Sequence, residues 1–172
     1  MVVGEGLAAL VLCTGNSARS ILGEALIARK GAGRVRAYSA GSRPKGVPHR
    51  GALRLLAAKG YDVAAFRSKS WDEFAAPDAP RIDMAITVCG NAAGEACPLF
   101  IGAPVRAHWG LADPADAVGA AAEDAAFAET WRLLELRVDA MLALPLESTA
   151  APERRAEHNA LGRTKGEERG AR

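Results

Sequence analysis

Apolar residues gather in four short runs along the first 108 residues, separated by segments of mixed polarity. Such runs are typical of strands that are buried on both faces, as in a parallel sheet covered by helices. A turn containing glycine and proline follows the second run, at 40–44. We therefore predict β-strands over 7–12, 35–39, 82–88 and 105–108.

The remaining segments carry helical periodicity and residues that end helices. A helix over 20–30 is followed by glycines, and a second helix has Pro48 in its first turn and ends at Gly60. The longest helix spans 120–144, where one apolar stripe recurs at steps of three and four until Pro145 ends the helix. We interpret the stripe as packing on the sheet rather than as a partner-binding face. It consists of Phe127, Trp131, Leu134, Val138 and Met141.

Strands that alternate with helices predict an α/β fold with an open, mainly four-stranded parallel sheet and helices on both faces. We expect a single domain over 1–148 and a polar, flexible C-terminal tail over 149–172. Ligands of such sheets bind at the carboxyl edge of the strands. Cys13, Cys89 and Asp113 are all predicted to lie at that edge.

The formal net charge of +2 resides at the C-terminal end of the chain, because 152–172 carries six basic and four acidic residues. The rest is balanced, which gives no electrostatic reason to expect nucleic acid. No apolar stretch is long enough to span a bilayer, and the N-terminus lacks the features of a signal peptide. We therefore expect a cytoplasmic protein without membrane partners, in a compartment where its three cysteines stay reduced.

The segment CTGNSARS, residues 13–20, joins the first predicted strand to the first helix. Backbone amides in such a turn converge on an anion, and the helix dipole adds partial positive charge. We predict an oxyanion-binding loop with Cys13 as a nucleophilic thiolate and Arg19 as a planar clamp for a tetrahedral oxyanion. The absence of a GK[ST] ending argues against a nucleotide, and a buried cysteine before an ordinary turn is the alternative. The loop residues are Thr14, Gly15, Asn16, Ser17, Ala18, Arg19 and Ser20.

The pattern Cys13-x5-Arg19 after the first strand resembles the phosphate loop of the low-molecular-weight protein tyrosine phosphatase family. This resemblance implies the fold of that family, with the cysteine as nucleophile and the arginine as oxyanion clamp. It also implies a general acid in an Asp-Pro dipeptide, for which HWGLADPAD supplies Asp113 and Pro114. An acid is needed because the departing oxygen must be protonated. The phosphatases carry a tyrosine after this dipeptide, where this chain has Ala115.

Cys89 and Cys97, in VCGNAAGEACP, extend the resemblance to the thioredoxin-coupled arsenate reductases, which share the phosphatase fold. The segments YSAGSRPKG and RSKSWDEF carry it as well. It implies that Cys13 forms an adduct with arsenate, that Cys89 displaces arsenite from it, and that Cys97 then moves the disulfide to Cys89–Cys97. The last two steps are thiol exchange reactions, in which a thiolate attacks a sulfur atom and displaces the group bonded to it. Thioredoxin would be the external reductant, and no cofactor would be bound.

The resemblance further implies that phosphate or sulfate fits the same loop and that the protein is a monomer. The main alternative is a phosphatase for phosphotyrosine or small phosphoesters, and a third is a non-enzymatic oxyanion or As(III) sensor. Seen alone, Cys89 and Cys97 are also compatible with small hydrophobic residues or with zinc ligands. However, C-x7-C is not a usual zinc spacing, and we predict no metal site. Some reductases have one residue fewer between these cysteines, and glutaredoxin or mycothiol systems are alternative reductants.

Certain members of the reductase family bind potassium beside the loop through Asn, Glu, Ser and Asp side chains. Asn16, Glu24 and Ser39 match three of these positions, but Lys69 stands where the aspartate would be. We hypothesise that the ammonium group of Lys69 replaces the potassium ion, because either cation neutralises Glu24.

Two loop residues are expected to support the nucleophile rather than to react. Asn16 is predicted to fix the loop by hydrogen bonds, and Ser20 to donate towards the sulfur of Cys13. His49 and His108 have no ligand-like spacing. We expect His49 at the surface and His108 as a structural neighbour of the acid loop.

Overall fold

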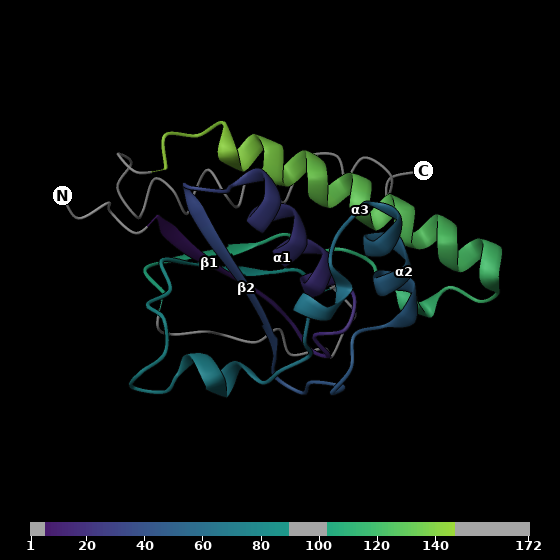
Figure 1. Ribbon diagram of the computed structural model, residues 1–172, viewed down its shortest axis with the longest axis horizontal. Coiled ribbons are helices and arrows are strands. Elements are labelled where there is room, and N and C mark those ends of the chain that lie inside the picture. Colours follow the sequence, from purple (N-terminus) through teal and green to yellow (C-terminus); the bar gives the residue numbers. More distant parts are fainter. Residues whose placement is uncertain (1–5, 90–102, 147–172) are drawn as a thin grey trace.

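Four parallel strands form one sheet in the computed structural model, which describes residues 6–89 and 103–146 (Figure 1). The central strand pairs Val11 with Ser39 on one side and with Ile86 on the other. The strands lie in the order β2-β1-β3-β4 and are β1 (Leu7–Cys13), β2 (Val35–Gly41), β3 (Met84–Thr87) and β4 (Val105–His108). The predicted parallel sheet is confirmed.

Both faces of the sheet are packed. The helices α1 (Arg19–Lys30), α2 (Arg50–Ala58) and α3 (Ala120–Leu142) share one core with one set of β1 side chains. Ala9 and Val11 face that core, whereas Leu10 and Leu12 belong to a second core. Trp71 and Phe74 of the 3-10 helix η2 (Trp71–Phe74) pack on the second core. Because β1 is covered on both sides, its sequence needs no polar face.

The apolar stripe of α3 is buried, with exposed fractions of at most 7%. This confirms that the stripe packs inside the protein. The helix ends at Leu142, two residues before the predicted end, and Pro145 follows shortly after it. Within the described residues, no helix has the length and apolar character needed to cross a membrane.

The start of α2 differs from the prediction. The helix begins at Arg50, so Pro48 precedes it rather than occupying its first turn. His49 is the N-cap, and its Nδ1 accepts a hydrogen bond of 3.0 Å from the backbone amide of Gly51. The imidazole is half-buried and stacks on Phe127, with 5.2 Å between ring centroids. His49 is therefore partly exposed, as a surface residue is, but the sequence analysis missed its roles in capping α2 and in stacking on Phe127.

The other boundaries shift by small amounts. β2 continues to Gly41, which pairs with Cys13 at the end of β1, and β3 is shorter than the predicted 82–88. Two further 3-10 helices, η1 (Val63–Ala65) and η3 (Pro114–Asp116), are too short to show a period in the sequence. Cys97 and the predicted tail 149–172 lie outside the described residues.

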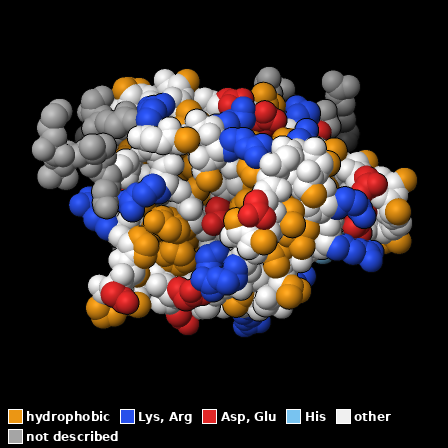
Figure 2. All heavy atoms as spheres, viewed as in Figure 1, with side chains coloured by type: hydrophobic (Ala, Val, Ile, Leu, Met, Phe, Trp, Pro, Cys, Tyr) orange, Lys and Arg blue, Asp and Glu red, His pale blue; other side chains and the backbone are white. Residues whose placement is uncertain are grey.

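Charge is mixed on the face shown in Figure 2, where basic side chains lie among acidic and apolar ones. Exposed ion pairs of the described residues include Arg67 with Glu73 and Arg132 with Glu129. Interspersed charges of this kind produce no large field of one sign on that face.

We predict that Gly51→Ala destabilises the fold by about 1–3 kcal/mol, although alanine favours helices over glycine by about 1 kcal/mol. A Cβ atom at this position would lie 2.6 Å from Cε2 of Phe127, which is fully buried in α3. Urea unfolding measures the change, with the exposed Arg50→Ala as a control within about 0.5 kcal/mol. Stabilisation by Gly51→Ala would contradict this tight contact between α2 and α3.

Candidate active site

The sulfur of Cys13 accepts hydrogen bonds at the carboxyl end of β1. The backbone amide of Asn16 donates to it over 3.2 Å, and Ser20 Oγ lies 2.9 Å away. Ser20 Oγ also accepts a hydrogen bond of 2.8 Å from the side-chain amide of Asn16, which leaves its own hydrogen to point at the sulfur. These contacts with the sulfur have the geometry that the predicted supporting roles of Asn16 and Ser20 require.

The side chain of Asn16 is fully buried and holds the loop by hydrogen bonds. Besides Ser20, its Nδ2 donates to Ser39 Oγ over 3.0 Å, and its Oδ1 accepts from the backbone amide of Lys69 over 2.9 Å. Its φ of 44° lies in the left-handed region, which asparagine tolerates better than most residues. Gly41 makes room for this turn, because a Cβ atom there would lie 2.5 Å from the carbonyl oxygen of Thr14.

The loop carbonyls are held from outside by the segment between β2 and α2. The amide of Arg43 donates to Thr14, and the amide of Lys45 donates to Gly15, each over 2.9 Å. The amide of His49 donates to the carbonyl of Ser17 over 2.8 Å. A loop whose carbonyls are bonded outwards is prepared to present its amides inwards, as anion binding requires.

A cavity of about 210 Å³ opens above Cys13. It brings two cations to the mouth of the loop, Arg43 and Lys45, which the sequence analysis did not select. Their signal in the sequence was two basic residues shortly after the end of β2, but only the fold shows that this segment borders the loop. The cavity is lined by Cys13, Thr14, Gly15, Ser17, Ala18, Arg19, Arg43, Lys45 and Asp113.

Arg19 and Asp113 meet at this cavity. The guanidinium of Arg19 is buried and donates from Nη1 to the carbonyl oxygen of Leu111 over 2.9 Å. Its Nη2 lies 3.5 Å from Oδ2 of Asp113, whose side chain is 30% exposed. The other oxygen of Asp113 accepts a hydrogen bond from the amide of Ala115 and caps η3. The fold thus brings the predicted acid, from the loop after β4, to the predicted nucleophile and clamp, which both lie in the segment 13–20.

Cys89 is fully buried two residues beyond β3. Leu12 pairs with Thr87 in the sheet, so the two cysteines follow paired positions on neighbouring strands. Both cysteines belong to the core shared with the α-helices. Cys97, the third thiol of the predicted relay, lies outside the described residues.

His108 lies at the end of β4, and its Nδ1 is 2.7 Å from Thr87 Oγ1. Burial and, as a smaller cause, the positive charge of Arg137 lower the pKa of His108.

Glu24 extends the hydrogen-bond chain behind the loop. Its Oε2 accepts from Ser39 Oγ over 2.8 Å, and Ser39 in turn accepts from Asn16. Burial raises the pKa of the Glu24 carboxyl, and the positive charge of Lys69 opposes that shift. Burial likewise lowers the pKa of Lys69, and the charge of Glu24 opposes this. The ammonium group of Lys69 therefore acts electrostatically on the carboxylate, as the potassium hypothesis requires.

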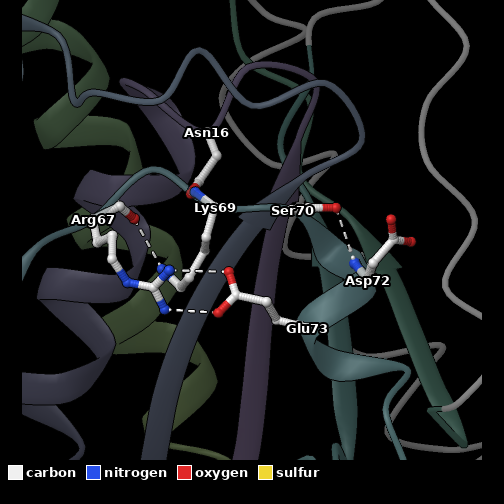
Figure 3. Close-up of polar contacts among 6 residues, drawn as sticks. All are labelled: Asn16, Arg67, Lys69, Ser70, Asp72 and Glu73. Atoms are coloured by element: carbon white, nitrogen blue, oxygen red, sulfur yellow. Dashed lines mark hydrogen bonds and ion pairs between the residues drawn. The ribbon is translucent and has the colours of Figure 1, made fainter.

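The side chain of Lys69 is held by its own segment (Figure 3). Its Nζ donates to the carbonyl oxygen of Arg67 over 2.9 Å. Arg67 makes two hydrogen bonds, of 3.0 and 2.8 Å, to Glu73 in η2. The backbone amide of the same lysine holds Asn16, so one residue supports the loop by a hydrogen bond and Glu24 by its charge.

Comparisons with known proteins agree with this geometry. The model of the family described as low molecular weight phosphotyrosine protein phosphatase matches residues 8–151. An arsenate reductase of Bacillus licheniformis is 35% identical over 122 residues, which are 70% of this chain and 84% of that protein.

Two solved structures show the same fold. One is an arsenate reductase in the phosphate binding state, with a TM-score of 0.58 at 24% identity, covering 77% of this chain and 97% of that one. The other is the tyrosine phosphatase Wzb of Escherichia coli K30 in complex with sulphate, with a TM-score of 0.56 at 17% identity, covering 78% and 98%. The fold is therefore common to proteins named for both activities.

We predict that Ser20→Ala slows alkylation of Cys13 by iodoacetamide at neutral pH by about tenfold or more, because a hydrogen bond to a charged sulfur is lost. The rate is measured by mass spectrometry of the modified peptide. Ser70→Ala, which removes the hydroxyl cap of η2 instead, serves as the matched control. An unchanged rate in Ser20→Ala would show that this hydroxyl does not stabilise the thiolate.

We predict that Lys69→Met destabilises the protein by about 1–2 kcal/mol at neutral pH, an amount reduced by partial exposure of the pair. Without the lysine, the pKa of Glu24 rises further above its ordinary 4.5. Between pH 4.5 and the raised pKa of Glu24 in the variant, the folded state binds more protons than the unfolded state. The stability of the variant therefore falls as the pH rises through this range. The difference from the unsubstituted protein should therefore shrink as the pH is lowered towards 4.5.

Denaturant unfolding at several pH values measures this difference, with the exposed Lys59→Met as a control for loss of positive charge. The unsubstituted protein should be equally stable in potassium chloride and sodium chloride at equal ionic strength. Stabilisation by potassium in particular would contradict the replacement of the ion by Lys69.

Proposed function

This chain belongs to the low molecular weight phosphotyrosine protein phosphatase family, and on that premise we propose that it reduces arsenate to arsenite through a relay of cysteine thiols. The family supplies an oxyanion loop with a cysteine nucleophile, which serves hydrolysis and reduction alike. The curated relative from Bacillus licheniformis, which is named an arsenate reductase, favours reduction.

The second buried thiol is the observation that carries this proposal. Hydrolysis of a phosphoester needs one nucleophilic sulfur, whereas reduction of As(V) to As(III) needs two electrons. Two thiols provide these electrons when they become a disulfide. Cys89 lies two residues beyond the end of β3, the strand next to that of Cys13, and both side chains are buried in one core. A second thiol in that place has a direct use in reduction and none in hydrolysis.

The cavity favours a small oxyanion over an aromatic phosphoester. Arg19, Arg43 and Lys45 supply positive charge, and the described lining residues include no aromatic side chain. Recognition of an aromatic ring commonly uses apolar or aromatic walls. Ala115, which follows the Asp-Pro dipeptide, is too small to form such a wall. A tetrahedral anion, by contrast, is matched by loop amides together with the forked guanidinium of Arg19.

The first step forms a bond between sulfur and arsenic. The thiolate of Cys13 attacks arsenate, held by the loop amides and Arg19, and one oxygen leaves as water. Asp113 donates the proton that this oxygen needs, from its place at the rim of the cavity. Phosphate and sulfate have the same shape and charge and would occupy the same loop.

The second step transfers the electrons. The thiolate of Cys89 attacks the sulfur of Cys13, and the electron pair of the breaking S–As bond stays on arsenic, which departs as arsenite. This leaves a Cys13–Cys89 disulfide. Cys97 then attacks Cys89 and restores the Cys13 thiol, and thioredoxin reduces the resulting Cys89–Cys97 disulfide. The relay needs reduced thiols at its start, a condition met in the cytoplasm.

We predict that the purified protein supports arsenate-dependent oxidation of NADPH in a coupled assay with thioredoxin and thioredoxin reductase. Cys89→Ser should abolish this activity, because the adduct on Cys13 then has no internal thiol to displace arsenite. Absorbance at the NADPH band measures the rate. Assays without arsenate, and with Ser70→Ala in place of Cys89→Ser, control for background and for substitution itself.

The same two proteins are also assayed with p-nitrophenyl phosphate. Failure to oxidise NADPH, together with rapid hydrolysis in both proteins, would assign the chain to the phosphatases. Activity that survives Cys89→Ser would refute the relay while leaving arsenate reduction intact. Activity with glutaredoxin or mycothiol, but not with thioredoxin, would correct only the reductant.

A further inference from the structure

We propose that Arg137 is a positioning residue that holds the acid loop, residues 109–113, in place behind the catalytic cavity. The inference rests on the proposed role of Asp113 as the proton donor. Arg137 lies on α3, outside the cavity, and no motif in the sequence marks it. It is a residue that acts on the reaction through the backbone of another segment.

The side chain of Arg137 is a charged group in a buried site, where its removal from water is unfavourable. Only 3% of the residue is exposed, between the buried stripe residues Leu134, Val138 and Met141. Burial lowers the pKa of its guanidinium, yet arginine stays charged in proteins. An apolar side chain in such a site avoids the cost of removing a charge from water, and is often no less stable. Core packing alone therefore gives no reason for a charge here.

The hydrogen bonds of Arg137 show what the charge does. Its Nη1 donates to the carbonyl oxygens of Trp109, over 3.2 Å, and of Gly110, over 3.3 Å. These residues directly follow β4 and begin the loop that ends at Asp113. Hydrogen bonds from a charged donor are stronger than those between neutral groups. The start of the acid loop is thus fastened to α3.

The far end of the same loop is held by the catalytic arginine. Arg19 donates to the carbonyl oxygen of Leu111 and faces Asp113, as described above. Two guanidiniums from different helices therefore hold successive residues of one short loop, Arg137 at its start and Arg19 at its end. The helices that carry them, α1 and α3, pack against each other. The position of the acid relative to the oxyanion loop is consequently fixed through both contacts.

This arrangement predicts a specific loss when Arg137 is replaced. Misplacing a reacting group by about 1 Å can cost 100-fold in rate. We expect Arg137→Met to lower kcat/KM for arsenate by about tenfold, and Arg137→Lys, which keeps a charged donor, to lose less. Alkylation of Cys13 should change by less than about twofold, because the oxyanion loop has other supports.

A double-mutant cycle between Arg137 and Asp113 tests whether the two act together. Asp113→Asn alone should lower kcat/KM by about 100-fold or more, as loss of a general acid does. In that background, Arg137→Met should have little further effect, since there is no acid left to position. Arg132→Met, which removes an exposed arginine from the same helix, is the matched control and should leave kcat/KM unchanged.

Each outcome decides the proposal. An equal loss from Arg137→Met in both backgrounds would mean that Arg137 only stabilises the fold, and would overturn it. Full activity in folded Arg137→Met, beside an impaired Asp113→Asn, would overturn this inference and leave the acid role intact. Full activity in Asp113→Asn would overturn both. If Arg137→Met does not fold, the cycle is measured with Arg137→Lys by the same criteria.

Discussion

The buried side-chain amide of Asn16 is the interaction on which the rest of the site depends. It bonds to three separate segments: Ser20 at the start of α1, Ser39 near the end of β2, and the backbone of Lys69 before η2. These bonds hold a left-handed residue at the centre of a loop that would otherwise have many conformations. The same residue offers its backbone amide to the Cys13 sulfur. One side chain therefore connects the fold to the nucleophile.

Among the described residues, the two buried charged side chains, Arg19 and Arg137, both lie at the acid loop. Arg19 and Arg137 hold the acid loop, while Glu24 and Lys69 lie behind the oxyanion loop with opposed charges. Each of these groups is costly to remove from water, and each is compensated by hydrogen bonds or by an opposite charge. The apolar packing of the α3 stripe and of β1 offsets the free-energy cost of burying these charges. Stability and chemistry are thus divided between different parts of one small domain.

The sequence predicted the elements well because their periods are local properties. The run LAALVLC reads as a doubly buried strand and forms one, and the stripe beginning at Phe127 packs as its spacing indicates. Errors occurred where a side chain competes with the backbone. The sequence predicted that Pro48 lies in the first turn of the second helix, but His49 caps α2 and the helix begins only at Arg50. The 3-10 helices were missed because three or four residues contain no period.

The candidate site was predictable to the extent that its chemistry lies in one continuous segment. CTGNSARS alone predicted that Cys13, Ser20 and Arg19 gather around one loop, because their order along a strand–turn–helix unit fixes their geometry. The positions of Arg43, Lys45 and Arg137 were decided only by the tertiary structure. An arginine in a helical stripe or a lysine in a turn has no functional meaning until packing places it against a distant backbone carbonyl or cavity. Contacts across many residues depend on how elements pack, and local sequence does not encode that packing in any one segment.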